Sequence, residues 1–395
     1  MTGPGRGHGP PAPRRVLLVV GARPNYMKAA PLLEAAPAHG LAVELVHTGQ
    51  HWDPALRDEL LRDLGIAEPR HRLEAGAGRT PLGQLAAMLE GLGRVVEAAD
   101  PELVVVVGDV NSTLAGALAA ARARPTPLPL CHVEAGLRSG DRSMPEEVNR
   151  VVVDQLADLL LVTEPSGLEH LRREGRTPRP DTAALLVGNA MIDTLLRLRP
   201  RARASRVLDD LGLAPGGYGL VTLHRPGNVD DPARLERLLA ALGAVARRLP
   251  LVFPVHPRTR ARLEGRALPP GLALAPPAPY LDFVRLMDAA RLVLTDSGGV
   301  QEETTVLRVP CLTLRDNTER PVTVERGTNR RVGADPAAIE AAAEAALAGP
   351  PWAPDRAGPP IPGWDGRAGA RIAAAIAAFL AGGPAACAAL PGVDA

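Results

Sequence analysis

The sequence predicts an α/β protein of two doubly wound domains. Three observations lead to this prediction. Short apolar runs rich in Val and Leu recur along the chain, stretches with apolar residues at helical spacing alternate with them, and the length of 395 residues suits two domains. Continuous apolar runs are typical of strands buried on both faces of a parallel sheet, and their alternation with helices indicates βαβ units.

The first half of the chain carries five apolar runs behind a Gly/Pro-rich lead, residues 1–13, which we expect to be disordered. We expect strands at residues 16–20, 43–47, 103–107, 128–133 and 159–163. Residues 53–65, 82–99 and 145–158 have the spacing of amphipathic helices. Residues 14–187 are therefore assigned to an N-terminal Rossmann-like domain.

The same alternation resumes after an arginine-rich helix and a Pro-Gly-Gly turn, which place the domain boundary near residues 187–218. We expect strands at residues 219–224, 251–256, 292–296 and 311–314, and helices at residues 230–249, 280–290 and 299–307. Residues 188–366 form the predicted C-terminal domain. A last helix, residues 367–382, is expected to return to the N-terminal domain, and residues 383–395 to form a disordered tail.

Composition excludes several classes of protein. The 45 Lys and Arg against 44 Asp and Glu leave a net charge of +1, which argues against a nucleic-acid-binding protein. No run reaches the ~18 to 20 uninterrupted apolar residues of a membrane span, so no membrane partner is expected. Cys131, Cys311 and Cys387 lack the spacing of a disulfide framework or a zinc site, which favours the cytoplasm.

Polar segments follow seven of the predicted strands. In open α/β sheets ligands bind beyond the carboxyl ends of the strands, so we expect one shared active-site cleft between the domains. The segments are GARPNYMK, TGQH, GDVNST, EAGLRS, HRPGN, HPR and DSGGVQEE.

The segment DSGGVQEE indicates a phosphate site. Gly298 and Gly299 would let the backbone approach an anion, and the helix that begins there offers free N–H groups. Glu303 could accept hydrogen bonds from a ribose, or be an ordinary first-turn glutamate. Cations at other strand ends could complete a diphosphate clamp, and these are Arg23, Lys28, Arg225, His256 and Arg320.

Three carboxylates, Asp109, Glu134 and Glu146, are the candidate acids and bases. Carboxylates that meet in a cleft raise one another's pKa, which suits proton transfer near neutral pH. Asp109 could instead cap a turn, and Glu146 could be a helix-start glutamate. The first strand lacks GxGxxG, which disfavours a dinucleotide dehydrogenase, and the histidines lack zinc spacing, so no cofactor or metal is expected. Lys28 is the only lysine among the 45 basic residues, which marks it as a candidate site residue.

Taken together, these motifs resemble the non-hydrolysing UDP-N-acetylglucosamine 2-epimerases from about residue 16 to residue 333. Ten blocks occur in that family's order: GARPNYMKAAPLL, TGQH, GDVNST, HVEAGLRS, MPEEVNR, VGNAMID, VTLHRP, PVHP, LTDSGGVQEE and LRDNTERPVTVERGTN. The resemblance implies the GT-B fold, two Rossmann-like domains that face a cleft, and a homodimer that needs no cofactor.

The resemblance also implies roles for individual residues. Nucleotide contacts fall on Arg23, Phe283, Ser297, Gly298, Gly299, Glu303 and Arg320. Catalytic carboxylates fall on Asp109, Glu134 and Glu146, with Lys28 and His224 close to the reacting sugar and the diphosphate. A second, regulatory sugar-nucleotide site would use Gln50, His51, Arg79, Arg225 and His256, although Asp53 stands where the family commonly has glutamine.

The implied reaction is the reversible conversion of UDP-N-acetylglucosamine to UDP-N-acetylmannosamine. UDP leaves C1 as the C2 proton is lost, which gives a bound 2-acetamidoglucal, and UDP then adds back after protonation on the other face. Three alternatives remain open: a GT-B glycosyltransferase that uses a UDP-sugar, a hydrolysing epimerase that releases UDP and N-acetylmannosamine, and a non-catalytic sugar-nucleotide regulator.

Overall fold

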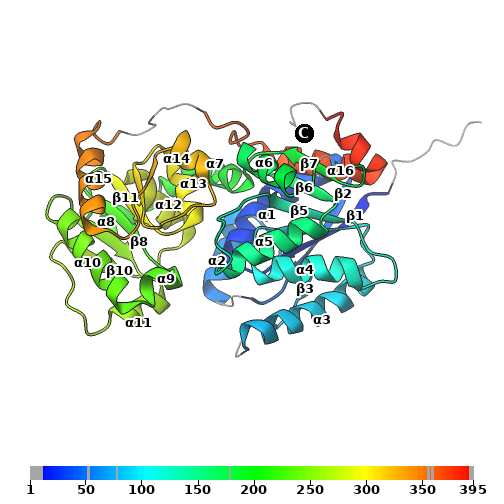
Figure 1. The fold of residues 1–395 in the computed structure, drawn as a ribbon, viewed down its shortest axis with the longest axis horizontal. Coiled ribbons are helices and arrows are strands. Elements are labelled where there is room, and N and C mark those ends of the chain that lie inside the picture. The colour runs from blue at the N-terminus through cyan, green and yellow to red at the C-terminus, as the bar shows by residue number, and fades with distance from the viewer. Residues whose placement is uncertain are drawn as a thin grey trace, which may run out of the picture.

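The structure is a computed structural model that describes residues 12–50, 54–76, 79–177, 179–353, 356 and 360–390, without the side chains of 54–57, 257 and 258. It contains two fully parallel sheets in separate domains (Figure 1). The seven-stranded sheet has the order β3-β2-β1-β4-β5-β6-β7. Its strands are β1 (Arg14–Val20), β2 (Leu41–His47), β3 (His71–Arg72), β4 (Leu103–Val107), β5 (Leu130–Ala135), β6 (Leu159–Val162) and β7 (Ala183–Leu186).

The six-stranded sheet of the C-terminal domain has the order β10-β9-β8-β11-β12-β13. Its strands are β8 (Gly219–Thr222), β9 (Leu251–Pro254), β10 (Leu272–Ala275), β11 (Leu292–Thr295), β12 (Cys311–Thr313) and β13 (Asn329–Arg331). Both sheets thus have the doubly wound strand order, and the predicted fold class is confirmed.

Helices connect the strands in each domain. The N-terminal domain has α1 (Arg23–Ala35), the 3-10 helix η1 (Ala36–His39), α2 (Pro54–Leu64), α3 (Pro81–Ala99), α4 (Asn111–Arg122), α5 (Pro145–Leu156) and α6 (Pro165–Arg173). The chain continues through α7 (Ala190–Ala202), α8 (Val207–Asp210), α9 (Pro226–Val229), α10 (Pro232–Ala246), α11 (Pro257–Leu263), α12 (Tyr280–Ala289), α13 (Gly298–Leu307), α14 (Pro321–Glu325) and α15 (Pro336–Ala348).

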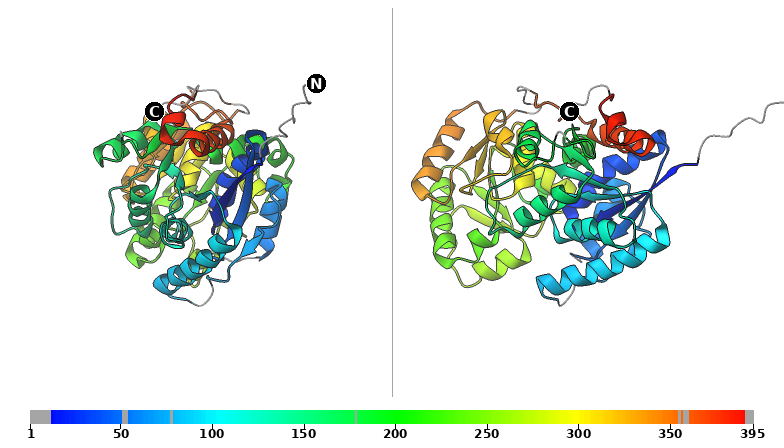
Figure 2. Two further views of the ribbon diagram at one scale, coloured as in Figure 1. Left: turned by 90° about the vertical axis from the view of Figure 1, so that its right-hand side faces the viewer. Right: turned by 45° about the vertical axis from the view of Figure 1, so that its right-hand side comes forward.

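The last helix, α16 (Ala368–Cys387), packs against α1, η1, β6 and β7 of the N-terminal domain. Figure 2 shows it in red beside the blue N-terminal elements in both views. By length and composition alone α16 could cross a membrane. Its Ile372 and Ile376 are fully buried in the core that α1 shares, and about a third of the apolar stretch is buried in the protein.

Two segments cross between the domains and touch each other. Gly188 leads out of the N-terminal domain, and Gly363 belongs to the segment that returns to it. Both have positive φ, 87° and 74°, and a Cβ on Gly188 would lie 1.9 Å from the Gly363 carbonyl oxygen. Arg371 of α16 holds the crossing, since it donates to the carbonyls of Val187 (2.7 Å) and Gly363 (2.8 Å). Only glycine fits this close approach.

Helix α7 joins the domains, because it packs on α1 on one side and on α12 and α13 on the other. Its Thr194 hydroxyl donates to the Met27 carbonyl, 2.5 Å away. The relative position of α1 and α13 is therefore set by contacts with one common helix.

The structure differs from the sequence-based expectations at three places. Strands β3, β7, β10 and β13 were not predicted, because β3 and β13 consist of polar residues and β7 and β10 of Ala and Leu, which also suit helices. Strand β5 begins at Leu130, after Pro129, and runs through Glu134, which was expected to follow the strand. The described tail is helical to Cys387, since Gly382 and Gly383 only kink α16 and Pro384 can start the next turn. Residues 1–11 and 391–395 lie outside the described residues.

Candidate active site

The carboxyl ends of the two sheets face each other. In each sheet the winding reverses between two neighbouring strands, β1 and β4 in one and β8 and β11 in the other. Ligands of doubly wound proteins bind at this point. Two ion pairs cross between the domains there, Glu134 with Arg320 (3.4 Å) and Glu146 with Arg225 (3.3 Å). The structure thus brings the predicted carboxylates and cations to one junction.

Glu134 lies at the centre of this junction in an unusual backbone conformation. Its φ is +76°, and the pairing of β5 with β6 shifts register between Val133 and Ala135. A non-glycine residue at positive φ is strained, and such strain collects at functional sites. The bulge directs the buried carboxylate to Lys28 Nζ at 2.5 Å. The only lysine of the chain therefore pairs with a central carboxylate of the site.

Asp109 follows β4 in the turn Gly108-Asp109-Val110. Its carboxylate forms an ion pair with Arg150 of α5, which is 2% exposed and also pairs with Glu147 at 2.8 Å. A Cβ on Gly108, whose φ is +70°, would come within 3.3 Å of Lys28 Nζ. A side chain at this position would crowd the ammonium group, and the positive φ itself favours glycine.

Glu146 lies in the first turn of α5 and is about one-third exposed. Its partner Arg225 follows β8 and also lies 3.9 Å from Glu319. Glu319 in turn pairs with Arg315 at 2.9 Å and Arg320 at 2.6 Å. Arginines around Glu319 hold the pKa of its buried carboxyl well below the ordinary value, although burial alone would raise it.

Arg320 is buried and lies near three carboxylates, Glu302 (2.7 Å), Glu319 (2.6 Å) and Glu134 (3.4 Å). Burial favours loss of its proton, but these carboxylates raise its pKa well above the ordinary value. Its guanidinium is also packed on α13, since a Cβ on Gly298 would lie 2.5 Å from Arg320 Nη1. Arg320 is thus a fixed cation beside the start of a helix.

The amino end of α13 has the expected form of a phosphate site. Ser297 is its N-cap residue, with extended backbone and no side-chain capping bond, and Gly298 and Gly299 form its first turn. The first N–H groups of a helix have no intrahelical partner and attract anions. With Arg320 alongside, this end can bind a phosphate group.

Glu303 is buried one turn into α13 and accepts a hydrogen bond from the Tyr280 hydroxyl at 2.9 Å. Burial raises the pKa of its carboxyl to about 7. The guanidinium of Arg23, the first residue of α1, lies 5.9 Å from the centre of the Tyr280 ring. Phe283 lies on the same helix as Tyr280 and packs partly on the core. These residues from both domains flank the phosphate site.

His224 follows β8 and is oriented by Asp296. The Asp296 carboxylate accepts hydrogen bonds from the backbone N–H groups of His224 and Arg225 and lies 3.1 Å from His224 Nδ1. The imidazole remains about half exposed, so its other nitrogen is available to a ligand. The Asp296 pKa lies below its ordinary value because these hydrogen bonds and His224 outweigh the effect of burial.

The residues expected in a regulatory site come from several elements. The Gln50 side chain accepts hydrogen bonds from the Ser112 N–H (3.0 Å) and hydroxyl (2.7 Å). Arg79 is exposed before α3, and His256 is exposed after β9. Arg225 belongs to the central junction through Glu146 and Glu319. His51 lies outside the described residues.

Comparison with known proteins agrees with this geometry. Residues 34–377 match the family model described as UDP-N-acetylglucosamine 2-epimerase. The chain belongs to this UDP-N-acetylglucosamine 2-epimerase family. A family relative, the UDP-2,3-diacetamido-2,3-dideoxy-D-glucuronate 2-epimerase of Pseudomonas aeruginosa, is 39% identical over 81% of this chain and 88% of its own length. The UDP-N-acetylglucosamine 2-epimerase of Methanocaldococcus jannaschii is 36% identical over the same shares.

Solved structures of the family superpose on nearly the whole chain. The Methanocaldococcus jannaschii enzyme in complex with UDP-GlcNAc and UDP has a TM-score of 0.79 at 34% identity and covers 91% of this chain and 98% of that one. The Rickettsia bellii UDP-N-acetylglucosamine 2-epimerase has a TM-score of 0.80 at 28% identity and covers 93% and 97%.

Several residues of this family site were not singled out from the sequence. Arg150 and Glu302 lie within quoted motifs, and the four-residue spacing of Glu146 and Arg150 on a helix could have indicated a shared face. Glu164, the N-cap residue of α6, is fully buried and accepts from the Ser166 hydroxyl at 2.6 Å. Burial raises its pKa to about 7, with Glu302 adding to the effect. In the sequence, Glu164 appears only as part of a Thr-Glu pair after a strand, and this pattern does not indicate burial.

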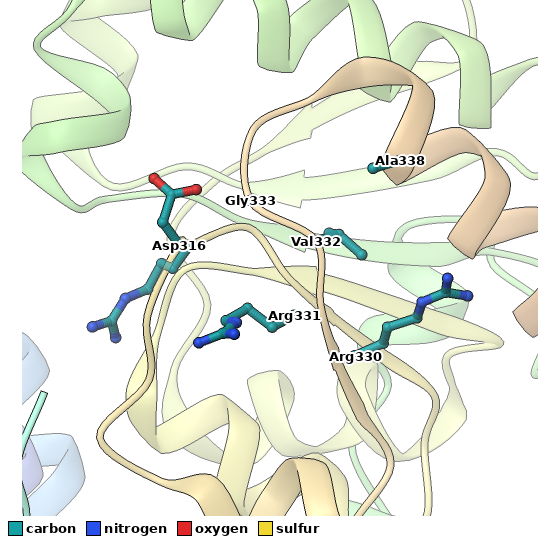
Figure 3. Close-up of a pocket in the computed structure, with 7 residues that line it drawn as sticks. Asp316, Arg330, Arg331, Val332, Gly333 and Ala338 are labelled. Atoms are coloured by element: carbon teal, nitrogen blue, oxygen red, sulfur yellow. The ribbon is translucent and has the colours of Figure 1, made fainter.

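A hollow of about 290 Å³ lies at the carboxyl ends of β12 and β13. Figure 3 shows that the side chains of Arg330 and Arg331 point to different sides of it. Arg315, which pairs with Glu319 of the junction, also lines the hollow, so the hollow adjoins the candidate active site. The junction around Glu134 and Arg320 remains the candidate active site.

Proposed function

We propose that this protein catalyses the reversible C2 epimerisation of UDP-N-acetylglucosamine to UDP-N-acetylmannosamine without hydrolysis. One observation carries the proposal: the Glu134–Lys28 pair of one domain meets Arg320 and the amino end of α13 from the other. Proton-transfer groups thus adjoin a diphosphate site. The family membership and the UDP-GlcNAc complex of the Methanocaldococcus jannaschii relative support the substrate.

Departure of UDP from C1 would be assisted by fixed positive charge. The C1–O bond breaks with its electron pair on the diphosphate, where negative charge increases. Arg320 and the N–H groups at the start of α13 are already oriented there, so they stabilise this charge without reorganisation. Arg23 and the exposed face of His224 add donors at the rim. Glu303 would hold the ribose hydroxyls.

Loss and return of the C2 proton require a base on one face of the sugar and an acid on the other. Asp109 and Glu134 come from the neighbouring strands β4 and β5, and Glu146 approaches from α5. Carboxylates from three elements can surround one carbon atom. The base takes the C2 proton as the C1–O electrons leave, and protonation of the resulting double bond from the opposite face precedes attack by UDP.

Incubation with UDP-N-acetylglucosamine alone in heavy water tests this function. The expected result is an epimeric sugar nucleotide with deuterium at C2, observed by NMR, without accumulation of free UDP. Accumulated UDP and N-acetylmannosamine would indicate a hydrolysing epimerase, and an unchanged substrate would indicate a transferase or a regulator. The UDP-2,3-diacetamido-glucuronate sugar, run in parallel, tests the chemistry of the 39% identical relative.

The resemblance further supports a homodimer, which light scattering would test. A cytoplasmic site is proposed as well, because Cys131, Cys311 and Cys387 are all buried and unpaired, as in a reducing compartment.

A further inference from the structure

A buried histidine lies directly beneath the candidate active site. His132 of β5 is fully buried, and both of its ring nitrogens face hydrogen-bond acceptors. Nδ1 lies 2.6 Å from an Asp154 carboxylate oxygen, and Nε2 lies 2.8 Å from the Gly108 carbonyl oxygen. A carbonyl oxygen can only accept, so Nε2 must carry a proton.

The surroundings of Asp154 show that it accepts as well. Its second carboxylate oxygen receives hydrogen bonds from the Gly136 N–H at 3.0 Å and forms an ion pair with Arg138 at 2.7 Å. Arg138 is itself held by Glu174 at 2.7 Å. Although burial would raise the Asp154 pKa, the Arg138 guanidinium and the Gly136 N–H on its second oxygen favour the ionised carboxylate. An ionised Asp154 therefore requires a proton on His132 Nδ1 too.

At the end of β4, three consecutive backbone carbonyls, those of residues 107 to 109, accept side-chain hydrogen bonds. The hydrogen bond from His132 to Gly108 is one of these. Asn25 and Thr113 donate to the Val107 carbonyl at 3.0 and 2.8 Å. Asn149 donates to the Asp109 carbonyl at 2.8 Å. His132 holds the carbonyl between them, which belongs to the peptide group joined directly to Asp109.

We infer that His132, doubly protonated and held by Asp154, is a positioning residue that fixes Asp109 relative to Glu134. It lies two residues before Glu134 on β5 and binds the residue before Asp109, so one side chain links the two carboxylates. The inference rests on the proposed function, because it concerns the spacing of that reaction's acid and base. A shift of about an ångström in such a group can cost ~10²-fold in rate.

Two substitutions separate the two hydrogen bonds of His132. The glutamine amide in His132→Gln can reach the place of Nε2 and donate to Gly108. The asparagine amide in His132→Asn can replace Nδ1 and keep Asp154 paired, but it is too short for Gly108. We expect His132→Asn to lose ~10²-fold in kcat with unchanged KM and UDP affinity, and His132→Gln to lose much less.

His170→Asn is the matched control. His170 of α6 also donates to a backbone carbonyl, that of Gly136, at 2.8 Å. The His170→Asn variant should leave turnover unchanged. Equal kcat losses for His132→Asn and His132→Gln, or a loss confined to UDP affinity, would overturn the inference.

A direct measurement does not depend on activity. In protein labelled with 15N-histidine, the His132 ring should show a proton on each nitrogen, and its signals should be those missing from His132→Gln. A ring nitrogen of His132 without a proton would overturn the inference even in an active enzyme. If the wild type binds UDP but epimerises nothing, the proposed function fails, while the NMR result still decides the protonation of His132.

Discussion

Glu134 reaches Lys28 and Arg320 only through a strained backbone at positive φ. Such a conformation costs of order 1–3 kcal/mol and persists only where neighbours enforce it. Here the register shift of β5 and the ion pair with Lys28 do so. The strain identifies Glu134 as the carboxylate whose exact placement matters most.

Glu134→Gln should therefore abolish turnover and keep UDP binding. The amide has the same shape but cannot take up the C2 proton, and loss of a positioned acid or base costs ~10² to 10⁴-fold. Deuterium incorporation at C2 gives the rate, and calorimetry with UDP gives the affinity. Wild-type turnover in this variant would remove Glu134 from the catalytic groups.

Lys28→Arg tests why this position has lysine in a chain that otherwise uses arginine. Lys28 is 6% exposed, with Glu134 at 2.5 Å and Gly108 beside its ammonium group. A planar guanidinium is wider than an ammonium group and would displace Glu134 by about an ångström, at a cost of ~10²-fold. The melting temperature should be nearly unchanged. Full activity would show that this position accepts any cation.

Glu164 should make the folded state less stable as pH rises. With a native pKa of about 7 against 4.5 in the unfolded chain, the native state binds more protons between these values, so the free energy of unfolding falls as pH increases. Glutamine cannot ionise. Glu164→Gln should match the wild type near pH 4.5 and exceed its stability by at most roughly 3 kcal/mol at pH 8.

Urea unfolding at a series of pH values measures this difference. Glu97→Gln, on the exposed surface of α3, is the control and should show no such gap. A Glu164→Gln difference that stays constant with pH would mean that the pKa of Glu164 is the same in the native and unfolded states.

At the scale of elements, α5 organises the site more than any strand does. Its inner face sends Glu146 to Arg225, Arg150 to Asp109 and Asp154 to His132. The first turn of α5 contains two glutamates and meets the other domain. The next two turns hold the end of β4 and also β5. Displacement of this one helix would disturb all three predicted carboxylates.

The amino end of α13 yields a prediction of its own. A methyl group in Gly298→Ala would lie 2.5 Å from Arg320 Nη1 and 2.8 Å from Glu319, so it must push the buried arginine away. Because Arg320 serves both the phosphate site and Glu134, UDP affinity and kcat should fall together, each by at least ~10-fold.

Gly93→Ala within α3 is the control, because its added methyl group meets open space. It should leave both UDP affinity and kcat unchanged. If Gly298→Ala lowered UDP affinity but left kcat unchanged, the phosphate site would act independently of the catalytic carboxylates.

Much of the element structure could be predicted, because it depends on local patterns. Continuous apolar runs identified β4 and β11, and polar segments behind them identified Asp109 and the Gly298 turn. The bulge at Glu134 could not be predicted, because it depends on pairing with β6. Pairings over long distances in sequence, such as Glu134 with Arg320, likewise leave no local pattern. The family resemblance, rather than spacing, joined those two residues beforehand.

At the scale of the whole molecule, the Gly188–Gly363 contact is the point where the domains are tied. In Gly188→Ala, positive φ should cost roughly 1–2 kcal/mol, and overlap with the Gly363 carbonyl should add about 1–3 kcal/mol. Gly175 has a φ of 68° and no neighbour within 4 Å, so Gly175→Ala isolates the backbone contribution. Thermal unfolding compares the two, and equal losses would show that the crossing tolerates a wider approach.

The position of α16 has a consequence for the order in which the chain can fold as it is synthesised. The N-terminal domain leaves the ribosome first, yet part of its core is made last, since Ile372 and Ile376 cover α1. Domains usually complete folding in the order of synthesis. In this protein, α1 of the nascent N-terminal domain therefore remains uncovered by α16 while the C-terminal domain is translated and folds. A ribosome-bound chain of residues 1–367, followed by a linker that fills the exit tunnel, should therefore carry a finished second domain beside a first one that still binds chaperones.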